Sequence, residues 1–113
     1  MSLATRAKLD TMRQLDYSLI TTNYYGVGTA FTHPIICIWV TNTTDRELTG
    51  SFGGTDDHFV LPSLGYFIID ISANKNISPA FSLAIGERIY VKSETTAPTK
   101  GRVTITTLYA FEN

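Results

Sequence analysis

The sequence predicts an all-β fold, a small antiparallel β-sandwich or jelly roll of seven to eight strands with a short N-terminal helix or arm. Thr, Ile and Val supply 17, 11 and 5 of the 113 residues, and branched side chains favour pleated strands. Gly, Pro, Asn and Asp gather between short apolar runs, as expected of turns that separate strands. A chain of 12.5 kDa has room for one domain with one modest core.

Residues 1–16 are the one segment whose pattern does not predict a strand. Apolar residues recur there at three- and four-residue steps among alternating charges: Leu3, Ala7, Leu9, Met12 and Leu15. Such spacing is typical of an amphipathic helix. We therefore expect a helix or arm over 1–16 and a β-sandwich domain over 17–113. The segment either lies across an open end of the sandwich or docks on a neighbouring subunit.

The next 28 residues, 17–44, contain no Asp, Glu, Lys or Arg. A run of this kind needs cover on part of its surface. Within it, residues 35–40 are almost continuously apolar, which predicts a strand buried on both faces, one of them by another chain. The single tryptophan, Trp39, is therefore expected to be buried.

Alternating apolar residues and flanking turn residues predict the other strands. The predicted ranges are 27–31, 48–52, 58–61, 66–72, 80–84, 88–92 and 102–111. In the last strand the apolar phase changes between Ile105 and Leu108. A one-residue slip of this kind predicts a bulge near Thr106 and Thr107.

The densest polar cluster is Asp56, Asp57 and His58 in a glycine-rich loop. It lacks the alternating oxygen ligands of a calcium loop and the second histidine of a zinc site, so it predicts a hairpin without a metal. Cys37 lies in an apolar run and His33 before a proline, so neither is expected to be catalytic. Without a nucleophile, phosphate or dinucleotide motif, no enzyme and no cofactor are predicted.

Charge and hydropathy exclude further classes of function. A net charge of −1 does not favour nucleic-acid binding, which depends on neutralised phosphates. No apolar run is long enough for a membrane-spanning helix, and the first residues carry charges instead of the apolar core of a signal peptide. We therefore expect a protein made in the cytoplasm, with no membrane and no nucleic acid among its partners.

Several motifs together resemble small virion structural proteins of tailed bacteriophages, over about residues 20–111. The motifs are N-T-T-D at 42–45, S-F-G-G-T-D-D-H at 51–58, V-L-P at 60–62, F-I-I-D-I-S-A-N at 67–74, I-G-E-R-I-Y-V-K at 85–92 and T-A-P-T-K-G at 96–101. Gly54 stands where related sequences often carry aspartate, which disfavours a shared acidic metal site.

The resemblance implies a virion protein that decorates the capsid or joins neck and tail components in multiple copies. Its expected partners are capsid, portal or tail proteins and further copies of itself. The residues expected at such contacts are Leu3, Leu9, Met12, Leu15, Tyr17, Tyr24 and Tyr25. Two alternatives remain open: a sugar-binding module associated with a receptor-binding fibre, and a bacterial β-sandwich of unrelated role.

Overall fold

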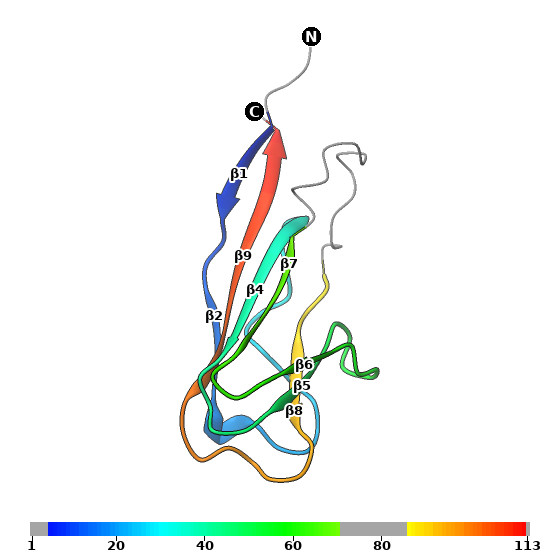
Figure 1. Ribbon diagram of the computed structural model, residues 1–113. Helices are drawn as coiled ribbons and strands as arrows, with labels where there is room; N and C mark the ends of the chain where they lie inside the picture. Colours follow the sequence, from blue (N-terminus) through cyan, green and yellow to red (C-terminus); the bar gives the residue numbers. More distant parts are fainter. Residues whose placement is uncertain (1–4, 71–85, 113) are drawn as a thin grey trace.

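The computed structural model describes residues 5–70 and 86–112 and shows two antiparallel β-sheets that pack as a sandwich (Figure 1). This confirms the predicted fold class. Leu3 and the predicted strand at 80–84 lie outside the described residues.

The larger sheet has the strand order β1-β9-β4-β7, and β2 also pairs with β9, next to β1 along that long strand. Every pairing in it is antiparallel. Its strands are β1 (Thr5–Leu9), β2 (Arg13–Asp16), β4 (Ile35–Asn42), β7 (Tyr66–Asp70) and β9 (Arg102–Glu112).

The smaller sheet has the order β3-β8-β5-β6. Its hairpin between β5 and β6 pairs Leu48 with Leu61 and Gly50 with Phe59, so the predicted hairpin around residues 56–58 is confirmed. A short 3-10 turn, η1 (Tyr17–Leu19), connects β2 to the segment that leads into this sheet. Its strands are β3 (Tyr25–Gly26), β5 (Leu48–Ser51), β6 (Phe59–Leu61) and β8 (Tyr90–Ser93).

One hydrophobic core lies between the sheets, and branched side chains from both inner faces fill it. The Phe59 ring of the smaller sheet stacks on the Phe67 ring of the larger sheet with centroids 4.1 Å apart. The largest side chains that are fully buried include Phe31, Ile35, Ile38, Leu48, Leu61, Ile89 and Ile105.

The N-terminal segment is not a helix within the described residues. It forms β1 and β2, which pair with the two halves of β9, so it belongs to the sandwich and not to a separate arm. In β2, buried and exposed residues alternate from Arg13 to Asp16, which is the period of a strand. The helical spacing of the apolar residues was misleading because the long-range pairing with β9 decides the local structure.

Two further predictions are corrected in the same way. Residues 27–31 form no strand. The Val27 and Phe31 N–H groups still donate to the carbonyls of Ile89 and Glu87, so this segment lies alongside the residues just before β8. The predicted bulge in β9 is absent from its ladder with β4. The register shift lies in β4 instead, between Ile35 and Cys37.

Trp39 is half-buried, as is Ile36, whereas Ile38 and Val40 are fully buried. The chain by itself therefore covers one face of β4 fully and the other only in part, and the cover expected from another chain stays a prediction. Ile38 and Val40 point into the core, and Trp39 lies on the opposite face of the sheet because successive strand residues alternate.

The turns that carry the resemblance meet at one corner of the sandwich. Thr99 donates from its N–H and hydroxyl to the Asp45 carboxylate, at 2.8 and 2.5 Å, and these bonds lower the pKa of Asp45. Gly101 has the positive φ that its turn position predicts, at +90°, and lies against Thr43. The N-T-T-D and T-A-P-T-K-G motifs therefore form one structural unit.

Candidate functional site

The sequence predicted a set of contact residues, and the structure brings only part of it together. Leu9 and Met12 are exposed on the larger sheet, and Leu15 is buried in the core. Tyr25 is exposed on β3 of the smaller sheet. Tyr17 and Tyr24 are half-buried, Tyr17 in the turn after β2 and Tyr24 beside β3. The described residues among them therefore do not form one surface.

The strand register defines a different surface, the side of the larger sheet that faces away from the core. Residues directly opposite one another in antiparallel strands share a face. Trp39 pairs with Ile68 on one side and with Thr106 on the other. We call this surface the outer face. It comprises Leu9, Met12, Gln14, Cys37, Trp39, Thr41, Tyr66, Ile68, Thr104, Thr106 and Leu108.

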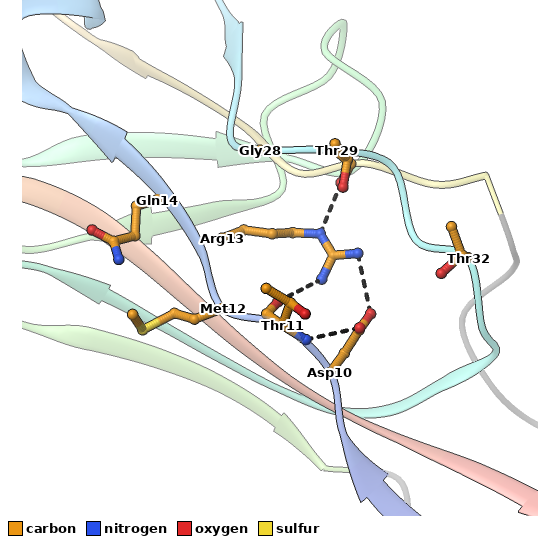
Figure 2. Close-up of a pocket in the computed structure, with 8 residues that line it drawn as sticks. All are labelled: Asp10, Thr11, Met12, Arg13, Gln14, Gly28, Thr29 and Thr32. Atoms are coloured by element: carbon orange, nitrogen blue, oxygen red, sulfur yellow. Dashed lines mark hydrogen bonds and ion pairs between the residues drawn. The ribbon is translucent and has the colours of Figure 1, made fainter.

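Ile68, Trp39 and Thr106 form a row across β7, β4 and β9, and Met12 continues this row at the edge next to β9. Arg13 pairs with Ile105, which places Met12 at the level of Thr106. Figure 2 shows the Met12 and Gln14 side chains pointing away from Arg13, toward the side of β9. Met12, Thr106, Trp39 and Ile68 thus form one row across the outer face, which we call the central row.

The outer face exposes large apolar side chains at both of its edges. Leu9 and Met12 are 59% and 50% exposed on one edge, and Tyr66 and Ile68 are 68% and 44% exposed on the other. Large apolar side chains exposed on one face of a sheet are typical of surfaces that bind a partner.

Charged groups are confined to the ends of the outer face. In the strand register, Asp70 lies opposite Cys37 at one end, and Asp16 lies opposite Arg102 at the other. The Arg102 guanidinium donates to Gln14 Oε1 at 2.7 Å. An uncharged centre with an aromatic residue and a polar rim is the anatomy of a protein–protein interface.

The outer surface of the smaller sheet is different, because charged groups occupy its middle. Lys92 Nζ lies 3.3 Å from Asp57 Oδ1 and 4.8 Å from the centroid of the Tyr24 ring. The Tyr24 hydroxyl donates to the same carboxylate. Thr49 donates to Glu94 at 2.7 Å. The Asp57 carboxylate is thus held by Lys92 and Tyr24. A surface with charged groups at its middle is suited to contact with solvent.

The same cluster gives a pH-dependent expectation. The hydrogen bond from Tyr24, with the Lys92 charge, holds the pKa of Asp57 below the usual 3.8. Burial, together with the hydrogen bond to the Asp57 carboxylate, raises the pKa of Tyr24 in turn. Because the folded pKa of Asp57 is depressed, the contact stabilises the fold above pH 3.8 and is lost as the pH falls through the lower, folded value.

Replacing Tyr24 with phenylalanine should therefore raise the pKa of Asp57 toward 3.8, since the main cause of its depression is removed. The carbon chemical shift of the Asp57 carboxyl, followed by NMR through acid pH, measures this. Tyr25→Phe, a change of the neighbouring and exposed tyrosine, should leave the titration unchanged. An equal shift in both variants would contradict the assignment.

A pocket of about 380 Å³ lies between residues 10–14 and the loop at 28–32, and Arg13 is its central residue (Figure 2). The side chain is only 7% exposed. Its guanidinium donates to the carbonyls of Thr29 and Ala30 at 2.8 and 3.3 Å, and it pairs with Asp10 at 3.3 Å. It also lies 4.9 Å from the centroid of the Phe31 ring. Arg13 thus holds β2 to the loop before β4.

Arg13→Met should lower the free energy of unfolding by about 2 kcal/mol, because charge-assisted bonds to two carbonyls are lost while the packed stem remains. Urea denaturation checks this value. Arg102→Met, at an exposed position on the neighbouring strand, should change stability by less than ~0.5 kcal/mol. Equal losses in the two variants would show that Arg13 has no special structural role.

The remaining candidates for chemistry are held in structural contacts. His33 stacks on Tyr109 with ring centroids 3.9 Å apart, and His58 Nδ1 accepts from the Phe52 N–H at 2.9 Å. Burial raises the pKa of the Cys37 thiol. Over residues 5–70 and 86–112, no three His, Cys, Asp or Glu side chains are placed to hold a metal ion. The same ranges contain no helix that is long and apolar enough to span a membrane.

The comparisons with known proteins give no family. No protein-family model matches the chain, and neither a curated protein nor a solved structure shows significant similarity to it.

Sequence reasoning missed Tyr66 and Ile68, half of the exposed apolar residues of the outer face. A signal for them exists in residues 66–69, Y-F-I-I, where both strand phases are apolar. One phase fills the core, so the other must be apolar on the outside.

Proposed function

We propose that the chain is a structural protein of a tailed-bacteriophage virion that acts by binding other virion proteins in multiple copies. The observation that carries the interaction role is the outer face, with an uncharged centre and exposed apolar residues at both edges. The phage assignment is supported by the resemblance of the turn and strand motifs, two of which meet at one corner.

The capsid, portal and tail components of the particle are the proposed partners. Among the described residues, the polar side chains most suggestive of chemistry are engaged by the chain itself, as Asp57 and Arg13 are. Many copies on a symmetric particle turn weak contacts into stable attachment.

The test is to purify particles of the phage that encodes the chain and to identify their proteins by mass spectrometry. We expect the chain in particles at a fixed ratio to the major capsid protein. Phage that encode Ile68→Lys should incorporate less of the chain than phage that encode Val60→Lys, a matched change at a residue 56% exposed on the smaller sheet. Particles without the chain would refute the proposal.

A sugar-binding module is the second candidate, because Tyr66 and Trp39 lie on the same face of neighbouring strands. Aromatic rings on one sheet face can stack on sugar rings. The exposed aliphatic residue beside them, Ile68, does not suit a hydroxylated ligand. Binding of the intact chain to a glycan array, abolished by Tyr66→Ala, would favour this candidate over the first.

A further inference from the structure

We infer that the outer face binds the outer face of a second copy, giving a twofold dimer whose two larger sheets stack on each other with Trp39 at the centre. This inference rests on the proposed function, since it names a partner for the same surface. A twofold contact must be self-complementary, because the same patch is used by both copies.

The arrangement of side chains meets that requirement. The central row runs Met12, Thr106, Trp39, Ile68 from edge to edge. The twofold axis lies between the two stacked sheets, runs parallel to the strands and passes over the gap between β9 and β4. It places the central row of one copy over that of the other, in the opposite order. Met12 of each copy then lies over Ile68 of the other, and Trp39 lies over Thr106. The twist of stacked sheets keeps these as neighbours and not as perfectly aligned pairs.

The rows beside the central row are compatible with the same axis. In one of them Gln14 and Tyr66 occupy the opposite edges, so the axis brings an amide toward a phenol. In the other, Leu9 and Asp70 occupy the edges. The two Asp70 carboxylates therefore lie on opposite sides of the dimer, and no like charges are placed together.

The area of the outer face suits a dimer contact. A strand residue occupies about 16 Å² of sheet, and the residues of the outer face alternate with core residues, so this face covers roughly 350 Å² of flat surface. Protruding side chains such as Tyr66 and Leu9 raise the accessible area toward the ~800 Å² that each partner contributes to a standard interface. A central tryptophan inside a ring of Thr, Leu and Ile is also the usual site of the strongest contact energy.

A second copy is favoured over a charged partner by the distribution of charge. The centre of the outer face has no Asp, Glu, Lys or Arg, so it offers nothing that selects an acidic or basic surface. Another uncharged face of the same shape leaves no buried charge unpaired. The smaller sheet, with Lys92 and Asp57 in its middle, lacks this property.

The test measures the mass of the full chain in solution by light scattering during size-exclusion chromatography. We expect twice the 12.5 kDa of one chain. Ile68→Lys and Met12→Lys, at opposite edges of the face, should each give monomers. Val60→Lys should remain dimeric. Circular dichroism establishes that each variant is folded, and the two edge variants provide independent tests if one of them fails to fold.

Trp39 is the only tryptophan, so its fluorescence reports on the proposed contact directly. Its emission should shift to the red when the dimer is diluted into monomers, and should be red-shifted at all concentrations in Ile68→Lys. A monomeric mass at every concentration, or equal dissociation by Val60→Lys, would overturn the inference. The particle assay stays separate: a monomer that enters virions refutes only the dimer, and a dimer absent from virions refutes only the virion role.

Discussion

Replacing Asn42 with alanine should lower the free energy of unfolding by about 4 kcal/mol, because several buried backbone groups lose their partners together. The Asn42 side chain is completely buried at the end of β4. Its amide nitrogen donates to the carbonyls of Arg46, Leu61 and Pro62 at 2.9 to 3.2 Å. Its oxygen accepts from the N–H and the hydroxyl of Thr44 at 2.9 and 2.6 Å.

These bonds join the end of a larger-sheet strand to the loops on both sides of β5 and β6, and water cannot replace them in a closed corner. Urea unfolding followed by circular dichroism measures the loss. Asn23→Ala, which removes the same amide from an exposed loop position, is the matched control and should cost less than ~0.5 kcal/mol. A loss below ~1 kcal/mol for Asn42→Ala would mean that the corner relaxes and rebuilds its bonds.

Gly101→Ala should be the other severe change, with a loss of about 3 kcal/mol from backbone strain and steric overlap together. Gly101 has a φ of +90°, and a Cβ there would lie 2.2 Å from the carbonyl oxygen of Thr43. That neighbour is backbone, so a side-chain rotation cannot relieve the overlap. The turn before β9 and the turn after β4 would have to separate.

The matched control for this prediction is Gly53→Ala. Gly53 has an ordinary φ and nothing within 4 Å of the added Cβ, so its change should leave stability nearly unaffected. Thermal unfolding of the two variants under the same conditions compares them. Similar melting temperatures would show that the Thr43 corner adapts to a Cβ at position 101.

The strands with a clear two-residue period or clear turns were predictable. The predicted ranges 48–52, 58–61 and 66–72 contain β5 (48–51), β6 (59–61) and the described strand β7 (66–70). Their turn residues have local causes, such as the positive φ of Gly101, and local causes are visible in a sequence.

The N-terminal strands and the surroundings of Trp39 were not predictable, because both depend on distant parts of the chain. β2 is a strand because β9, nearly 90 residues later, supplies its partner, with Asp16 opposite Arg102. The position of Trp39 depends on which side of β4 faces the smaller sheet. An apolar run such as 35–40 gives no alternation from which to choose.

The candidate site was predictable to the extent that its residues stand out locally. Leu9 and Met12 were expected at a contact because they belong to an apolar stripe with helical spacing among charged residues. Leu15 was expected there too, but it is buried. Tyr66 and Ile68 lie on the same face as Leu9 and Met12 because of the strand register across β1 and β2, β9, β4 and β7. No local sequence pattern contains this register.

The central position of β9 determines the order in which the molecule can fold during synthesis. β9 follows the other described strands in the chain, yet it separates β1 and β2 from β4 in the larger sheet. Until β9 is made, β7 is the one partner of β4 among the described strands, and β1 and β2 have none there. The described strands of the smaller sheet all precede β9, so their pairing does not depend on it. Closure of the larger sheet is thus a late step that requires long-range pairing, which is slow, and until then the unpaired edge of β4 is open to association with other nascent chains.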